Sequence, residues 1–172
     1  MSMNMCLKQA SEMEIARLAR EGIDPDALLE DSFAFGPKKG AGAKNAVLNL
    51  DKSWHVLHFL FTGRAWDGPL PAGVLLAGGR EVGEDLGYGP ARTLTPDETK
   101  AFAKFLSGQS VPALAKRIDT GTMKKLGISG ADHEDAGARA DLEADVDHYL
   151  PQLQTYVGGA AKDGNGLVIW MS

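Results

Sequence analysis

Residues 51–63 read DKSWHVLHFLFTG, and the longest apolar run of the chain lies inside this segment. Its apolar side chains point almost all round a helix, and a helix that is apolar on nearly every side lies inside a protein. The Asp51 carboxylate is suited to capping the helix start, and Gly63 is suited to ending it. We therefore expect a central buried helix here, with the rest of the chain packed around it.

Further helices are indicated on both sides of this segment. Ser11 and Glu14 have the spacing of a capping box, and Thr95 and Glu98 repeat that spacing. Apolar residues recur at helical spacing through 142–160, where Pro151 should kink or split the helix. Shorter helices are expected at 25–30, at 71–77 and after Ser110.

Strands are indicated at three places, Met5–Lys8, Ala91–Leu94 and Leu167–Trp170, which are short and rich in residues that favour strands. They do not alternate regularly with helices, which predicts an α+β fold, a helix-rich single domain over 1–172 with a small sheet of about three strands packed by about seven helices. The stretch 36–47, rich in Gly and Lys, is expected to be a flexible loop, and 80–90 another loop. One core should join Trp54, Leu57, Phe61, Phe102, Leu106, Leu153, Val157 and Ile169.

The charge balance limits the classes of partner. Lys and Arg number 18 against 23 Asp and Glu, a net charge of −5. A mildly acidic chain is a poor candidate for nucleic-acid binding, which needs a basic face. No segment has the length of a membrane span or the pattern of a signal peptide, and Cys6 is the single cysteine. We expect a cytoplasmic protein that binds neither nucleic acid nor membrane.

Motifs for cofactors and metals are absent from the sequence. The glycines at 36–44 and 87–89 fit neither the phosphate loop nor the dinucleotide fingerprint. The alternating acids of 141–147 resemble a calcium loop, but Val146 stands where glycine is required. We expect no cofactor, no metal and no catalytic constellation.

Four residues are the best candidates for a binding site. His55 and His58 share one face of the helix at 51–63, and both titrate near neutral pH. Tyr88 and Arg92 follow in a glycine-rich segment, where an arginine can clamp a carboxylate or a phosphate. The competing interpretation is structural: one His is a hydrogen-bonded core residue, and Arg92 pairs with Asp85 or with a helix C-terminus.

The chain resembles a known family in several of these segments. The helix at 52–63, the pair Gly78-Gly79, the stretch 87–96 and the final helix and strand at 156–170 are similar, in the same order, to the YfbM-like family, domain of unknown function 1877, found in bacteria. The resemblance covers nearly the whole chain. It implies a small α+β fold and no known activity.

Function therefore stays open between different classes. The leading expectation is a non-catalytic binding or protein-interaction domain with an unknown protein or small-molecule partner. The alternative is a small enzyme in which a His and Arg92 form a polar site for an anionic small molecule. A metal-dependent protein is a third hypothesis. A polar pocket holding His55, His58, Tyr88 and Arg92 would favour the enzyme.

Overall fold

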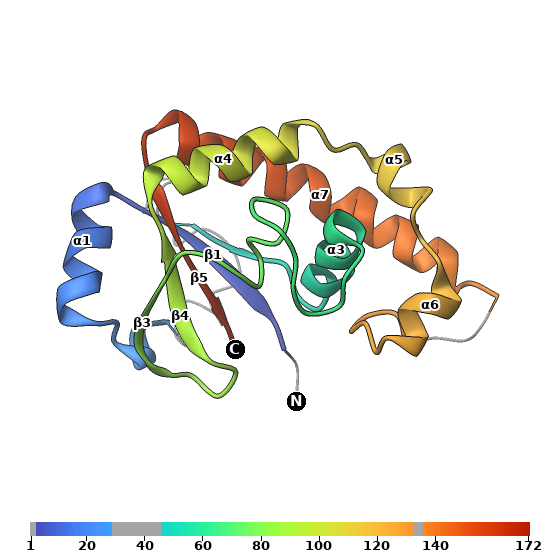
Figure 1. Ribbon diagram of the computed structural model, residues 1–172, viewed down its shortest axis with the longest axis horizontal. Coiled ribbons are helices and arrows are strands. Elements are labelled where there is room, and N and C mark those ends of the chain that lie inside the picture. The colour runs from blue at the N-terminus through green and yellow to red at the C-terminus, as the bar shows by residue number, and fades with distance from the viewer. Residues whose placement is uncertain (1–2, 29–45, 133–135) are drawn as a thin grey trace.

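An antiparallel sheet with the strand order β2-β1-β5-β4-β3 divides the molecule into two helical layers (Figure 1). The computed structural model describes residues 3–28, 46–132 and 136–172. In the sheet, β1 and β5 pair from Met5 with Met171 to Ala10 with Gly166. The strands are β1 Met5–Ala10, β2 Val47–Asn49, β3 Arg80–Asp85, β4 Pro90–Leu94 and β5 Gly166–Met171.

The two long inner strands supply side chains to a hydrophobic cluster on each face of the sheet. Leu7 and Ile169 belong to the larger cluster, whereas Cys6 and Val168 belong to a smaller one. Successive side chains of a strand point to opposite faces, so a single strand serves both clusters. The middle of the sheet is therefore buried on both sides.

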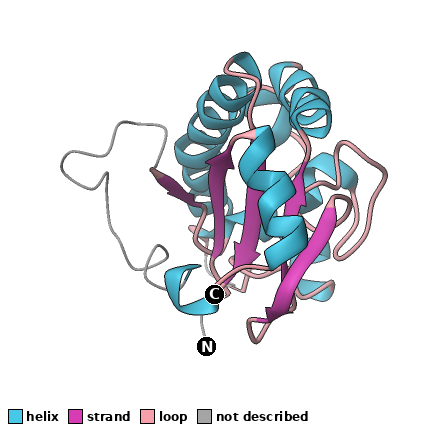
Figure 2. Ribbon diagram, turned by 90° about the vertical axis from the view of Figure 1, so that its left-hand side faces the viewer, coloured by secondary structure: helices cyan, strands magenta, loops and turns pink. Residues whose placement is uncertain are grey.

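Helices from distant parts of the chain cover the two faces. One face carries α3, α4 and α7, and α1 crosses the other face, in front of the sheet in Figure 2. The short helices α5 and α6 lie beside α7 (Figure 1). The helices are α1 Glu12–Glu21, α3 Ser53–Thr62, α4 Pro96–Ser107, α5 Val111–Ala115, α6 Thr120–Lys125 and α7 Ala138–Lys162.

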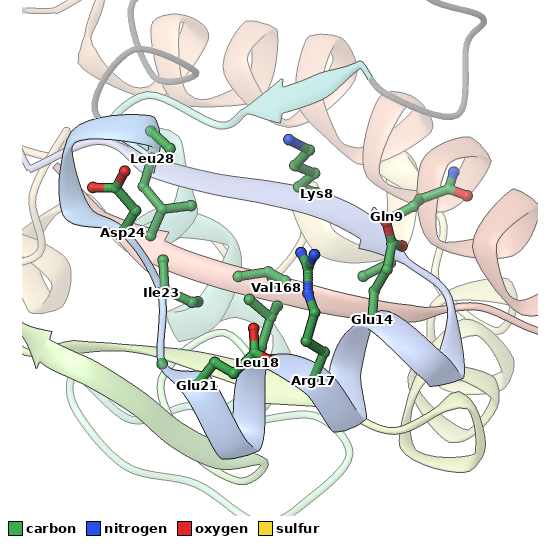
Figure 3. Close-up of a pocket in the computed structure, with 13 residues that line it drawn as sticks. Lys8, Gln9, Glu14, Arg17, Leu18, Glu21, Ile23, Asp24, Leu28 and Val168 are labelled. Carbon is green, nitrogen blue, oxygen red and sulfur yellow. The ribbon is translucent and has the colours of Figure 1, made fainter.

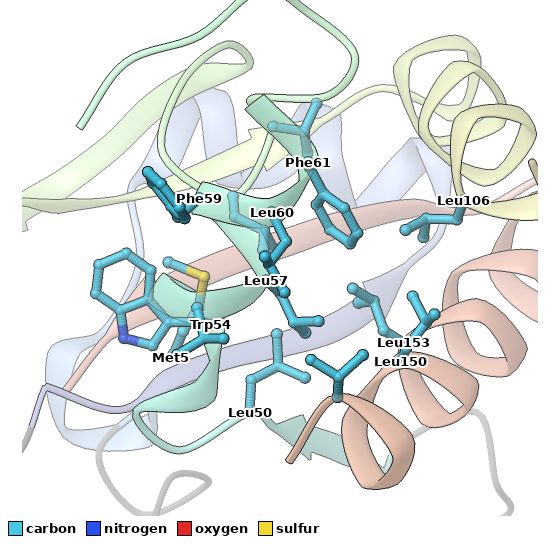
Figure 4. Close-up of a cluster of buried hydrophobic side chains, with 14 of the residues drawn as sticks. Met5, Leu50, Trp54, Leu57, Phe59, Leu60, Phe61, Leu106, Leu150 and Leu153 are labelled. Carbon is cyan, nitrogen blue, oxygen red and sulfur yellow. The ribbon is translucent and has the colours of Figure 1, made fainter. Parts of the chain in front are cut away.

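The core forms around α3, as the sequence predicts. All residues of α3 from Ser53 to Phe61 are buried. The larger cluster contains every member of the predicted core, from Trp54 to Ile169, and Figure 4 shows the side chains of α3 meeting those of α4 and α7. Full burial of one Leu or Phe side chain contributes about 1.5–3 kcal/mol, so this cluster dominates the stability of the fold.

Several predicted helix boundaries are confirmed. Ser11 and Glu14 form the expected capping box of α1, and Thr95 and Glu98 form that of α4. Pro151 does not split the helix, because α7 runs on through it as one helix of 25 residues. Buried side chains on both sides of Pro151 hold the two halves of α7 against the same core, which offsets the lost backbone hydrogen bond.

The α+β class is confirmed, but the sheet has five strands rather than about three. The additional strands are the two edges. β2 is three residues long, and its first residue, Val47, lies in the segment 36–47 that the sequence predicts to be a loop. Residues 36–45 of that segment lie outside the described residues. β3 occupies part of the segment expected to be the loop 80–90.

Two local expectations are wrong. Asp51 does not cap α3: it lies in a turn with φ of 49°, and the helix begins at Ser53 without a side-chain cap on Lys52. Residues 71–77 form successive turns rather than a helix. Their backbone hydrogen bonds do not follow one spacing: the N–H of Val74 donates three residues back to Pro71, whereas the N–H of Ala77 donates four residues back to Gly73.

Candidate functional site

His55 is a buried residue with both ring nitrogens bound to the backbone. Nε2 lies 2.7 Å from the carbonyl oxygen of Ala65, and the N–H of Ser129 donates to Nδ1 at 2.9 Å. The ring stacks on Trp54 with centroids 4.7 Å apart and lies 4.5 Å from the ring of Trp66. These contacts fix the neutral tautomer with the proton on Nε2. Burial lowers the pKa of His55, while the bond to Ala65 opposes that shift.

His58, one turn further along α3, also binds the segment that follows this helix. Its Nε2 lies 3.0 Å from the carbonyl oxygen of Asp67, and its other ring nitrogen, Nδ1, is buried without a hydrogen-bond partner among the described residues. Burial is the main cause that lowers the pKa of His58. Both histidines therefore tie the segment after α3 onto that helix.

Arg92 is bound to four backbone carbonyls of the turns that replace the expected helix. Nη1 donates to Ala77 and Gly78, both at 2.9 Å, and Nη2 donates to Val74 at 3.0 Å and to Leu75 at 2.7 Å. Desolvation lowers the pKa of Arg92, and Glu81 acts in the opposite direction. The guanidinium satisfies carbonyls that the irregular turns leave unpaired. This role is close to the structural interpretation in which Arg92 pairs with a helix C-terminus.

Two of the four predicted site residues line a common hollow. Tyr88 and Arg92 line a hollow of about 40 Å³ together with residues of the sheet, among them Met5 and Trp170. His55 and His58 are absent from its lining. A hollow of this volume has room for a water molecule but not for a metabolite.

A larger cleft lies on the opposite face of the sheet, between α1 and the strands β1 and β5 (Figure 3). Its volume is about 690 Å³, within the range of about 300–1,000 Å³ that is usual for small-molecule sites. Its lining includes Lys8, Gln9, Ala10, Glu14, Arg17, Leu18, Glu21, Gly22, Ile23, Asp24, Ala27, Leu28 and Val168.

Local structure explains how the cleft is positioned. The Ser11 capping box starts α1 directly after β1, and Gly22, with φ of 78°, ends it and turns the chain back toward the sheet. Such a positive φ is readily adopted only by glycine. Ile15 anchors α1 in the smaller hydrophobic cluster. Leu18, one turn further along α1, also packs against this cluster, and the cleft is the space beside the helix.

Two cationic side chains reach this space from different elements. Lys8 projects from β1 and is half-buried, and Arg17 projects from α1. Figure 3 shows the Arg17 guanidinium pointing from α1 toward β1, whereas the Lys8 ammonium lies at the end of its side chain that is farther from Arg17. Both residues line the cleft, and cationic side chains in a cleft attract anionic groups.

Sequence reasoning missed Lys8 and Arg17 because only the fold brings them to the lining of one cleft. Lys8 does interrupt the otherwise apolar side of β1 that carries Cys6 and Ala10, and this is the one signal that was readable. A lysine on the buried side of a strand needs a partner, a ligand or water. Nothing in the sequence says which helix lies above it.

The described residues offer neither a metal-ligand cluster nor a membrane-spanning helix. Across residues 3–28, 46–132 and 136–172, no three His, Cys, Asp or Glu side chains gather in a way that could hold a metal ion. In the same ranges no helix combines the length and the apolar character needed to cross a bilayer.

These features define a class: an α+β domain with one antiparallel sheet, helices on both faces and a polar cleft under α1. A family model described as Domain of unknown function (DUF1877) matches residues 1–170, and the chain belongs to this family. The fold is similar to that of a crystal structure of YfbM, a protein of unknown function from Escherichia coli, with a TM-score of 0.71, 17% identity and 99% of each chain covered. No curated protein matches the chain.

Proposed function

We propose that this protein is a non-catalytic binding domain that holds a small molecule in the cleft between α1 and the sheet. The observation that carries the proposal is the cleft itself, about 690 Å³ in volume and lined by both charged and apolar side chains. Binding sites of this kind combine apolar walls with a few polar groups that orient the ligand.

The alternative, an enzyme built on a His and Arg92, has less support. Catalysis requires a side chain that can meet a substrate. His55 uses both ring nitrogens on backbone atoms, His58 is buried with Nε2 on Asp67, and Arg92 spans four carbonyls. Among the described residues, the lining of the 690 Å³ cleft includes no His, Cys or Ser, three residue types often used as nucleophile or base.

Two variants, each with tryptophan in place of an alanine, test the proposal. Ala27 lines the cleft and is exposed, so Ala27→Trp reduces the space without displacing a buried group. Ala16 is equally exposed on α1 but does not line the cleft, which makes Ala16→Trp the matched control.

The wild type and both variants would be screened by thermal shift and by NMR against organic acids, amines, sugars and nucleotides. We expect at least one compound to bind the wild type and Ala16→Trp, and to lose binding in Ala27→Trp. A panel in which every bound compound tolerates Ala27→Trp would place binding elsewhere and refute the proposal.

A further inference from the structure

We infer that the protein has a second binding site, an apolar hollow between α4 and the turns that precede β3, and that it takes a small uncharged hydrocarbon. The hollow has a volume of about 270 Å³, and its lining includes Leu70, Val74, Leu94 and Ala101. An apolar cavity of about 150 Å³ is enough to hold a benzene ring. The lining shares no described residue with the cleft under α1, so this inference is independent of the proposed function.

The wall of the hollow opposite α4 is held in place by hydrogen bonds and by a close backbone approach. The Arg92 guanidinium donates to the carbonyls of Gly78 at 2.9 Å and Val74 at 3.0 Å. Gly79 has a φ of 71°, and a Cβ there would lie 2.5 Å from the carbonyl oxygen of Thr93 in β4. The turns are thus tied to the sheet, and the hollow exists before any ligand arrives. A preformed site binds without the loss of entropy that ordering a loop would cost.

The polar groups around the hollow are largely engaged within the fold. Besides the two carbonyls bound by Arg92, the carbonyl of Pro71 accepts from the N–H of Val74 at 3.2 Å. Among the described residues of the lining, Glu98 alone is charged. Its carboxylate accepts from the N–H of Thr95 at 2.8 Å in the capping box of α4. A charged ligand would lose its hydration here with little compensation, so the electrostatic character of the hollow matches an uncharged ligand.

The hollow also leaves apolar surface open to solvent. Leu94 has no exposed surface, whereas the Leu70 side chain is 56% exposed. Leu70 stands beside Gly78, where a Cβ would lie 2.9 Å from its Cδ1 atom. Water in an apolar hollow finds few hydrogen-bond partners, and an apolar group that displaces such water gains affinity. Covering the exposed part of Leu70 adds to that gain.

Three probes of one size test the chemical class. Toluene is uncharged, benzylammonium carries a positive charge and benzoate carries a negative charge on the same ring. Kd for each would be measured from the NMR shifts of the Val74 and Leu94 methyl groups in the wild type. We expect toluene to bind at least about 10-fold tighter than either ion. Benzylammonium is the sharper comparison, because Glu98 is an acid in the lining.

Two phenylalanine variants test the location. Ala101 lines the hollow and is exposed on α4, so Ala101→Phe fills the space without displacing a buried group. Ala144 is exposed on α7 and is not among the lining residues, which makes Ala144→Phe the matched control. Toluene binding should be lost in Ala101→Phe and unchanged in Ala144→Phe. Thermal unfolding of both variants checks that each is folded.

Several outcomes would overturn the inference. They are an ion that binds as tightly as toluene, toluene binding that persists in Ala101→Phe, and the absence of toluene binding to the wild type. The wild type alone supplies a further test, because shifts at Val168 rather than at Val74 and Leu94 would place toluene in the cleft under α1. The proposed function has a separate readout, since a compound of its screen that is lost in Ala27→Trp but kept in Ala101→Phe binds in that cleft.

Discussion

The N–H of Ser129 donates to Nδ1 of His55 at 2.9 Å, which joins the segment after α6 to the central helix α3. A protonated imidazole has no lone pair on Nδ1 and cannot accept this bond. The structure therefore depends on His55 remaining neutral. This relationship links the stability of the core to pH.

Stability should fall as the pH drops below the ordinary histidine pKa of 6.5. Both His55 and His58 have lowered pKa values in the folded state, so the unfolded chain takes up protons first. The stabilisation is fully present above 6.5 and is lost as the pH falls toward the folded pKa values. Urea unfolding at about pH 7.5 and about pH 5.5 measures the change.

The matched comparison uses two glutamine variants. His55→Gln should flatten this pH dependence, whereas His148→Gln, which alters a histidine on exposed α7 surface, should preserve it. A wild-type unfolding free energy that stays constant between these two pH values would contradict the prediction.

Replacing Arg92 by Lys should lower the unfolding free energy by about 2–4 kcal/mol. Lysine keeps the charge but cannot span the carbonyls of Val74, Leu75, Ala77 and Gly78. Urea denaturation measures the loss, with the exposed Arg20→Lys as a control that should change little. Equal stability of the two variants would show that the four hydrogen bonds make no net contribution to the free energy of unfolding.

Truncating Leu57 to Ala should cost about 2–5 kcal/mol, since it leaves a cavity in a packed core. Leu57 has no exposed surface and lies at the centre of the larger hydrophobic cluster (Figure 4). Leu126→Ala, at a side chain that is 43% exposed, is the control and should cost much less. Thermal and urea unfolding of both variants would decide; similar losses would argue against the assigned core.

Tyr156→Phe should loosen the sheet where the inner strand β1 lies beside the start of the edge strand β2. The Tyr156 hydroxyl accepts from the N–H of Gln9 at 3.0 Å and donates to the carbonyl of Ala46 at 2.6 Å. Its loss should cost about 1–3 kcal/mol, because two partly buried backbone groups lose their partner. Hydrogen exchange of the Gln9 amide should speed up, while Tyr149→Phe on the same helix should leave it protected.

The same phenol gives a prediction at high pH. Desolvation raises the pKa of Tyr156 to about 12. The folded state thus favours the neutral phenol, and its contribution to stability is present below about pH 10 and lost as the pH rises toward 12. Ultraviolet titration of wild type against Tyr156→Phe would detect a late-titrating tyrosine. An ordinary titration of all tyrosines would contradict this assignment.

The elements that sequence reasoning found are those with a strong local signal. The capping boxes at Ser11 and Thr95 and the apolar run of α3 each carry their own start, stop or burial pattern. The two strands that the sequence did not predict, β2 and β3, carry no such local signal. β2 is very short, and β3 is a charged edge with only Val82 buried, so its composition is that of a loop. Charged edge strands are common because they prevent pairing with other chains.

The candidate site was harder to predict because its parts are joined by topology. The imidazoles of α3 and the guanidinium of Arg92 looked available in the sequence, yet their partners are backbone carbonyls and N–H groups, which every residue has. The cleft needs α1 to cross β1 and β5, the first and the last strands. A pattern confined to one segment cannot reveal that crossing.

The position of β5 between β1 and β4 also constrains how the protein is made. A chain emerging from the ribosome can form β1, α3 and the β3–β4 hairpin early, but the centre of its sheet stays empty until residues 166–171 have left the exit tunnel. Both faces of the future sheet remain exposed during that interval. The last strand therefore sets the time of folding, and the nascent chain must be protected from aggregation until it arrives.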